Sequence, residues 1–387
     1  METREREAWL ALAAIEGVGG ATLTRLIARY GGAAGVLDAA RAGRLARPVS
    51  QGGEGGRLDA EVVARVEATA RDPRPAIDAL ARLDLWTLTP LDPGYPSRFD
   101  VLGLPPPVLY GWGDVAALEP DFAVAVVGTR RPTPFGRAFA ARLTRHLVDG
   151  SALIVSGLAI GIDGAAHAAT LEAGGRTVAF IGASHEQPGP RAHRALVRGI
   201  LEGGGAVVSE LAPGKPSGKG MFPRRNRLLA ALADAVLVVE APAKSGAINT
   251  AHHALELGRP LFVAPGRPGD PSTAGCLRLL RETPARPLIG VGELDEDLAA
   301  LGIGRAAADV GARVGAAAAV NSTVGLGEVE RTVARLIARA PGSLETITAG
   351  TGLPPAAVAG AVTLLQLRGL VRLVDGALLP TALLDPG

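Results

Sequence analysis

The chain has 387 residues, of which 48% are hydrophobic and 20% are charged, so its composition is that of a globular protein of two or three domains and excludes a disordered chain. Its formal net charge of +2 excludes a polycation that binds nucleic acid over its whole surface, so any such site must be a local patch. The single cysteine, Cys276, excludes an internal disulfide framework and a cysteine-rich zinc site.

The hydropathy pattern predicts no membrane segment. The chain begins with the highly charged run Met1-Glu2-Thr3-Arg4-Glu5-Arg6-Glu7, which does not open a signal peptide. No uninterrupted apolar segment reaches about 18 residues, the length that crosses a bilayer. We therefore expect a soluble, cytoplasmic protein with no membrane partner.

Residues 1–85 are predicted to form a small helical domain. Short helices over 8–40 flank the sequence Ile15-Glu16-Gly17-Val18-Gly19-Gly20. Two interpretations stay open: a helix-hairpin-helix whose backbone amides hold a phosphate, or a helical hairpin whose glycines only permit a tight turn. Further along we expect a loop over 41–59, a helix near 60–83, a strand at 86–88 and an extended, proline-rich segment over 91–114.

From residue 122 onward, short apolar segments alternate with segments of helical length. The apolar segments predict six buried strands, at 123–127, 152–155, 177–181, 206–208, 235–239 and 260–264. This alternation predicts an α/β fold with a doubly wound parallel sheet. Such sheets bind ligands beyond the carboxyl ends of their strands, so the residues that follow the strands are the candidates for a site.

Cationic and small residues follow three of these strands. The first ends in Gly128-Thr129-Arg130-Arg131, and the second is followed by Ser156 and by Gly157 and Gly161, which allow close backbone approach. After the fifth comes Lys244-Ser245-Gly246, whose amides and hydroxyl can cradle a phosphate. The dinucleotide fingerprint GxGxxG is missing after the first strand, which disfavours a dehydrogenase.

A further cationic run precedes the fifth strand. It is Phe222-Pro223-Arg224-Arg225-Asn226-Arg227, and an apolar run over 228–232 follows it. Pro223 suits the first position of a helix, so the pattern predicts three guanidiniums on a helix's first turn. Each such cation costs about 0.3–1 kcal/mol against the helix dipole at low salt, and an anion bound there would offset the cost.

Six cations are predicted to gather at one edge of the sheet: Arg130, Arg131, Arg224, Arg225, Arg227 and Lys244. No carboxylate pair, nucleophile–base pair or metal-ligand spacing accompanies them, so the pattern favours phosphate binding, with no catalytic residue and no metal. Asp163 is placed to cap the helix after the second strand. Glu240 either orients an arginine or caps a strand end, and Thr250 belongs to the loop after the fifth strand.

The C-terminal part is predicted to be a separate domain. Residues 291–325, rich in glycine and alanine, predict a linker. Residues 326–387 predict three helices and a hairpin that turns at Asp375-Gly376, which together make a winged helix. Its third helix carries Arg368 as its only charge, so we expect it to contact protein or to pack internally more than to read duplex DNA.

The ordered motifs resemble one known family, the DNA-processing proteins DprA (Smf). The resemblance covers roughly residues 90–285. It lies in Gly128-Thr-Arg, Ser156-Gly-Leu-Ala-x-Gly-Ile-Asp163, Phe222-Pro-x-Arg-Asn-Arg227, Val238-Val-Glu-Ala241, Ser245-Gly-x-x-x-Thr-Ala251, Pro265-Gly266 and Gly275-Cys276-x-x-Leu279-Leu-Arg281. The chain departs from the family at Ile160, where an arginine is usual, and at residues 185–195.

The resemblance implies an extended Rossmann-like domain over 86–290 that binds single-stranded DNA, flanked by a sterile-alpha-motif-like or helix-hairpin-helix front and a winged-helix tail. It also implies a homodimer without cofactor or catalytic activity that protects incoming strands during natural transformation and loads the RecA recombinase for homologous recombination. The expected single-stranded-DNA site comprises Gly128, Thr129, Arg130, Arg131, Ser156, Gly157, Gly161, Phe222, Arg224, Arg225, Asn226, Arg227, Lys244, Ser245 and Gly246.

Two other functions compete with strand binding. Rossmann-type nucleotide phosphoribohydrolases use a Pro-Gly-Gly-x-Gly-Thr-x-x-Glu loop, and here the corresponding loop lacks the glutamate after Thr250. A duplex-DNA binder would act through the winged-helix tail, and any duplex binding is expected to be weaker. Within the strand-binding interpretation, we expect Phe222→Ala to weaken binding without changing its salt dependence, and Arg225→Ala to flatten that dependence.

Overall fold

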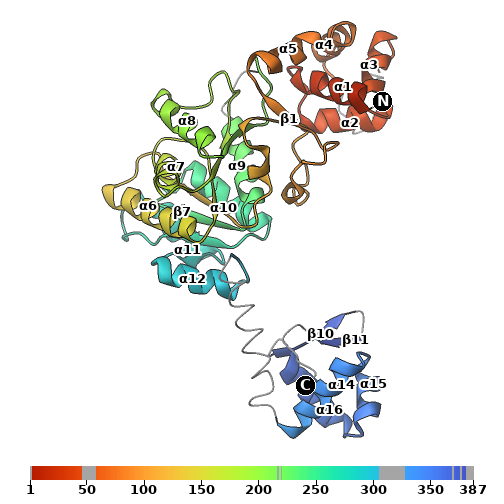
Figure 1. Ribbon diagram of the computed structural model, residues 1–387, viewed down its shortest axis with the longest axis vertical. Helices are drawn as coiled ribbons and strands as arrows, with labels where there is room; N and C mark the ends of the chain where they lie inside the picture. Colours follow the sequence, from red (N-terminus) through yellow and green to blue (C-terminus); the bar gives the residue numbers. More distant parts are fainter. Residues whose placement is uncertain are drawn as a thin grey trace. The chain divides into compact units, whose positions relative to one another are not determined.

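The computed structural model describes residues 2–45, 58–215, 218, 220–304, 327–367, 370–374 and 377–380 (Figure 1). The chain divides into two compact units, Met1–Leu294 and Asp295–Gly387. The first unit contains a group of helices and a large sheet, and the second contains a small helical domain with a hairpin. The finer domain boundaries expected at residues 85, 290 and 325 stay predictions.

The N-terminal helices share one buried apolar core. That core also takes in Val108, Tyr110 and Ala212, so the helices are fastened to the edge of the sheet. The single helix expected near 60–83 is two helices, because Pro73 interrupts the hydrogen-bond ladder. The helices are α1 (Glu2–Ala14), α2 (Gly20–Tyr30), α3 (Ala33–Arg41), α4 (Ala60–Arg71) and α5 (Arg74–Arg82).

A nine-stranded sheet forms the centre of the first unit, in the order β1-β2-β6-β5-β4-β3-β7-β8-β9. The predicted parallel, doubly wound arrangement is confirmed for the six expected strands. β2 pairs antiparallel with β6, and β1 pairs antiparallel with β2. The strands are β1 (Trp86–Leu88), β2 (Leu109–Gly113), β3 (Ala123–Gly128), β4 (Leu153–Ser156), β5 (Thr177–Ile181), β6 (Ala206–Ser209), β7 (Ala235–Val239), β8 (Leu261–Val263) and β9 (Arg286–Pro287). Part of the segment expected to be extended, residues 91–114, is helical and contains the 3-10 turn η1 (Ser97–Phe99). A second 3-10 turn, η2 (Val115–Leu118), directly follows this segment.

Helices cover both faces of this sheet (Figure 1). Helices α6 and α7 pack together, and α9 packs with α10, as right-handed crossovers require when the winding direction reverses. The helices are α6 (Pro134–Asp149), α7 (Ile162–Glu172), α8 (Arg194–Glu202) after the turn η3 (Arg191–His193), α9 (Met221–Leu232), α10 (Gly246–Glu256), α11 (Ala274–Glu282) and α12 (Val291–Ala300). Helix α12 occupies the start of the expected linker, which is a correction; its apolar Leu294 and Leu298 are buried.

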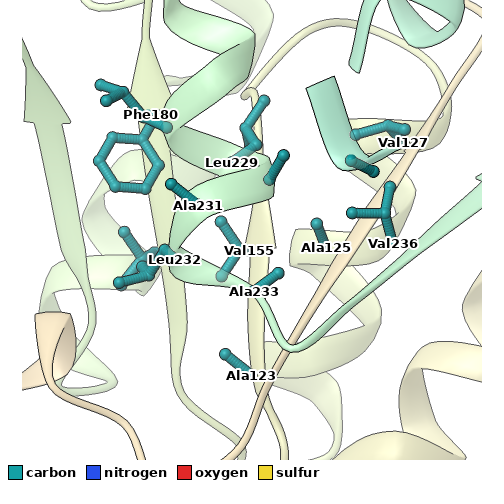
Figure 2. Packing of buried hydrophobic residues seen from close by; sticks show 14 of the residues in the cluster. Ala123, Ala125, Val127, Val155, Phe180, Leu229, Ala231, Leu232, Ala233 and Val236 are labelled. Atoms are coloured by element: carbon teal, nitrogen blue, oxygen red, sulfur yellow. The ribbon is translucent and has the colours of Figure 1, made fainter. Parts of the chain in front are cut away.

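Helix α9 is anchored by its apolar second half. Leu228, Leu229 and the residues up to Leu232 are almost fully buried. Figure 2 shows Leu229, Ala231 and Leu232 beside Val155 and Phe180 of the underlying strands. Because the buried half is held rigidly by the sheet, the cationic first half is held in a defined position at the sheet's carboxyl edge.

The second unit has the predicted winged-helix elements. They are α14 (Glu328–Arg339), α15 (Leu344–Thr351), α16 (Pro355–Leu367) and the hairpin strands β10 (Val371–Val374) and β11 (Ala377–Pro380). The expected turn at Asp375-Gly376, as well as Arg368, lies outside the described residues. In the described part of the chain no single helix has the length and apolarity to cross a membrane; α15 and α16 meet such a criterion only jointly, with a 118° bend between them.

Candidate nucleic-acid interface

The sheet has its switch point between β3 and β7. The chain leaves β3 toward β4 on one side and leaves β7 toward β8 on the other. The loops after β3 and β7 therefore part at the carboxyl edge and leave a crevice, where doubly wound sheets bind ligands.

A cavity of about 900 Å³ occupies this crevice. It is lined by the end of β3, the first turns of α9 and the loop that leads into α10. The structure brings together twelve of the residues singled out from the sequence: Gly128, Thr129, Arg130, Arg131, Asp163, Phe222, Arg225, Asn226, Lys244, Ser245, Gly246 and Thr250. Pro271 and Ser272 also line it; nothing in their sequence context pointed to them.

The lining of this cavity carries an excess of positive charge. Arg130, Arg131, Arg225 and Lys244 contribute four cations, and Asp163 contributes the one carboxylate, so the excess is three charges. Arg130, Arg131 and Lys244 are exposed. No histidine or cysteine is among the lining residues. The side chains thus match a polyanion that remains partly in solvent.

An aromatic ring stands beside these cations. The Phe222 side chain is 40% exposed although it belongs to a helix with a buried second half. Its ring packs on Gly182, where an added Cβ would come within 2.8 Å of it. The Arg130 guanidinium lies over the ring, 5.8 Å from its centroid. Aromatic rings and guanidinium groups are both side chains on which nucleic-acid bases stack.

The N-terminus of α10 forms the opposite wall. Ser245 is its N-cap residue, yet its side chain makes no capping bond and its Oγ is buried without a partner among the described residues. No acidic residue occupies the helix's first turn. The Asn226 amide donates to Gly246 O and to Asn249 Oδ1, both at 3.1 Å, and so ties the loop to α9. The uncapped amides leave this helix end suited to an anion.

Two buried side chains of opposite charge, Arg225 and Asp163, lie beneath the cavity. Arg225 and Asp163 are each only 7% exposed, and Arg225 Nη1 donates to Phe180 O. At Gly157, an added Cβ would lie 2.5 Å from the guanidinium and 2.6 Å from the carboxylate, so only glycine fits between them. Burial lowers the pKa of Arg225 to about 10 and raises the pKa of Asp163 against the pull of Arg225. Arg225 thus serves mainly to hold α9 and α7 together.

Two of the four described non-glycine residues with positive φ lie at strand ends that border the cavity. Leu158 after β4 and Glu240 after β7 have φ of 57° and 50°, in the left-handed region, at a cost of about 1–2 kcal/mol each. The Glu240 carboxylate accepts hydrogen bonds from the backbone N and the Oγ1 of Thr133, and its carbonyl accepts from Thr129 N at 2.7 Å. Glu240 therefore fixes the start of α6 and does not orient an arginine.

The helix that carries the cationic run begins earlier than predicted. Helix α9 starts at Met221, so Pro223 is its third residue, and only Arg224 of the three arginines belongs to its first turn. Pro223 is tolerated there because first-turn N–H groups have no partner within a helix.

Five expected residues do not line the cavity. The Ser156 hydroxyl is buried and donates to Val126 O at 2.6 Å, and Gly157 and Gly161 serve close backbone packing. Arg227 forms a buried ion pair with Glu210, and Arg224 lines a different cavity. The expected capping role of Asp163 is replaced by hydrogen bonds from the Gly157 and Ala159 amides and by the favourable charge of Arg225.

Comparison with known proteins gives consistent similarities. The model for DNA recombination-mediator protein A matches residues 86–299, and that for the DprA winged helix domain matches residues 317–377. Protein Smf of Synechocystis sp. is 35% identical over 286 residues, which span 72% of this chain and 69% of the relative.

Two solved structures are also similar. The X-ray structure of DNA processing protein A from Streptococcus pneumoniae has a TM-score of 0.61 at 27% identity, over 75% of this chain and 96% of that one. DNA processing protein A from Helicobacter pylori, whose structure describes a single-stranded DNA binding mode, has a TM-score of 0.50 at 33% identity, over 55% of this chain and 95% of that one.

Proposed function

This chain belongs to the DprA/Smf family of DNA recombination-mediator proteins, and we propose that it binds single-stranded DNA in the cavity at the carboxyl ends of β3 and β7. The observation that carries the proposal is the excess of three positive charges around an exposed phenylalanine ring. The single-stranded DNA binding mode of the Helicobacter pylori relative supports the choice of ligand.

The proposed binding mode divides the work between phosphates and bases. The exposed side chains of Arg130, Arg131 and Lys244 meet the phosphates, together with the uncapped amides at the start of α10. One base stacks on the surface formed by Phe222 and Arg130. Backbone charge and a π-face are common to all nucleotides, so the binding is largely indifferent to sequence.

We further infer that the protein holds the DNA strand and does not catalyse the breaking of its bonds. Asp163 is the one carboxylate of the lining. It is buried beside Arg225 and accepts hydrogen bonds from the Gly157 and Ala159 amides, so it is poorly placed to act as a general base. Family membership extends the proposal to a cytoplasmic homodimer that protects incoming strands in natural transformation and helps load RecA. Release of adenine from nucleoside monophosphates would instead support the phosphoribohydrolase alternative.

A salt titration of binding tests the proposal. Single-strand affinity should fall with salt with a logarithmic slope of about −2, from three exposed cations at about 0.7 each. Duplex of the same length should bind more weakly, and sedimentation of the same samples reports dimer formation. Duplex outcompeting the single strand, with the advantage lost on deletion of residues 325–387, would favour the duplex-binding alternative and refute the assignment.

A further inference from the structure

A second cavity, of about 260 Å³, lies where the N-terminal helices meet the sheet domain. One wall is the glycine hairpin at residues 17–20, which leads into α2, and the other includes Met221 and Arg224 of the first turn of α9. Two cations, Arg224 and Lys215, line it. The proposed strand-binding cavity does not account for any of these groups.

Arg224 points toward a positively polarised helix end. Added Cβ atoms at Gly19 and Gly20 would lie 4.0 Å and 3.3 Å from its guanidinium nitrogens. Its guanidinium is half-buried, and no hydrogen bond or ion pair with another described residue is present for it. A cation held against the N-terminus of α2 is unfavourable unless an anion lies between them.

The start of α2 supplies nothing to neutralise this charge. Its N-cap residue is Gly19, with extended backbone, no side chain and therefore no capping bond, and its first turn contains no acidic residue. The start of α10, which also lacks a side-chain cap, belongs to the strand-binding cavity. The hairpin's glycines either only permit the turn or present their amides to a phosphate, and the position of Arg224 favours the second interpretation.

Lys215 fastens the hairpin beside Arg224. Its ammonium donates to Ala13 O at 2.6 Å and to Val18 O at 3.2 Å. Burial, reinforced by the charge of Arg224, lowers the pKa of Lys215 to about 8, so the surroundings of Lys215 disfavour its charged form.

Two carboxylates also border the cavity, and each has another arginine as partner. Glu210 forms the buried ion pair with Arg227, and Glu16 lies 3.5 Å from Arg65. Arg224 and Lys215 are therefore not cancelled by a dedicated counter-charge. The lining thus has two cations and two carboxylates and no net charge, but both carboxylates are held by arginines outside the lining, which leaves Arg224 without an ion pair among the described residues.

The same helical turn borders both cavities. Phe222 and Pro223 line the strand-binding cavity, whereas the flanking residues Met221 and Arg224 line the second one. A helix is about 10 Å across, which about three nucleotides of a stacked strand would span. A strand seated on Phe222 can therefore pass over the start of α9 to the glycine hairpin.

We propose that the second cavity binds a further phosphate of the same single strand, held by Arg224, Lys215 and the first amides of α2. The N-terminal helices would then take part in strand binding directly. This inference rests on the proposed function, because the strand must first occupy the cavity beside β3.

The test compares a strand of about 4 nucleotides with one of about 16, the range over which single-strand sites extend. In the full chain, Arg224→Ala should leave binding of the short strand unchanged and weaken binding of the long strand about five- to tenfold at low salt. Its long-strand salt slope should become shallower by about 0.7. The matched control is Arg29→Ala, which removes an exposed arginine from the opposite end of α2.

Gly19→Asp gives a second, independent variant. The backbone of Gly19 has φ of −88° and ψ of 171°, the conformation of a helix-capping residue. A Cβ added at Gly19 would make only ordinary contact with Arg224. The aspartate should cap α2, pair with Arg224 and raise the melting temperature, while reducing long-strand affinity as Arg224→Ala does. A purely structural hairpin predicts the opposite for binding: a stabilised protein with unchanged affinity.

The outcomes separate this inference from the proposed function. If wild-type protein binds neither strand, the proposed function itself fails. If it binds both, but Arg224→Ala and Gly19→Asp leave long-strand affinity and slope equal to those of Arg29→Ala, the second phosphate site is refuted and the first site stands.

Discussion

Replacing Arg225 by alanine distinguishes a structural cation from a DNA contact. Its guanidinium is 7% exposed, donates to Phe180 O and faces the Asp163 carboxylate. Its removal leaves Asp163 buried with the Gly157 and Ala159 amides as hydrogen-bond partners and with the weaker influence of the Arg130 charge. Loss of the hydrogen bond to Phe180 O and of the favourable charge beside the buried Asp163 should cost about 1–3 kcal/mol, a large share of the roughly 5–15 kcal/mol that stabilises a domain.

Arg130→Ala is the matched comparison. Arg130 is exposed and lines the same cavity, so its removal should change the free energy of unfolding by less than about 0.5 kcal/mol. It should make the salt slope of single-strand binding shallower by about 0.7. Arg225→Ala should lose stability while its folded fraction keeps a slope close to that of the wild type. This reverses the expectation from sequence, in which Arg225 was a phosphate contact.

Urea denaturation gives the free energies of unfolding, and fluorescence anisotropy of a labelled strand at several salt concentrations gives the slopes. Binding of Arg225→Ala is measured where circular dichroism shows it to be folded. Arg225 would instead be a phosphate contact if Arg225→Ala is as stable as the wild type and flattens the slope as much as Arg130→Ala does.

Two further substitutions have definite expected outcomes. Phe222→Ala should weaken single-strand binding by about 1–3 kcal/mol through lost stacking, with an unchanged salt slope, because the ring is uncharged; a shallower slope would mean that it acts by displacing a phosphate contact. His167 is buried and its pKa is lowered to about 3, because burial opposes its charge. Since the unfolded chain takes up this proton near pH 6.5 and the folded one does not, stability should be greatest above that pH. It should fall toward pH 3 by up to about 1.4 kcal/mol per pH unit. His167→Gln should make the pH dependence of the free energy of unfolding shallower, as measured by urea titrations between about pH 4.5 and 7. Replacement of the exposed His252 is the control and should leave this dependence unchanged. The same pH dependence in His167→Gln and the wild type would refute a buried, neutral His167.

Much of the architecture could be predicted because it depends on local pattern. Apolar runs separated by helical lengths predicted the six parallel strands of the sheet and thus the edge at which a ligand binds. The antiparallel β2 was missed, because its sequence Leu109–Gly113 has glycines and a proline-rich approach that are untypical of a strand. Its place in the sheet comes from pairing with β6, a segment almost a hundred residues away.

The candidate site was predicted as a set of residues, and the structure sorted that set. Residues at strand ends, such as Arg130 and Lys244, could be placed because parallel strands bring their carboxyl ends to one edge. Ser156 could not, because its hydroxyl is taken by Val126 O, a partner on a neighbouring strand.

By itself, the sequence determined the family, the sheet and the presence of a cationic run at the start of a buried helix. Only the tertiary structure decided what each arginine does. Successive side chains on a helix diverge by about 100°, so neighbours in the run meet different surroundings. Arg225 turns under the sheet edge to Asp163, Arg227 turns to Glu210, and Arg224 turns to the glycine hairpin. Those partners lie on segments distant in sequence, so no local pattern could assign them.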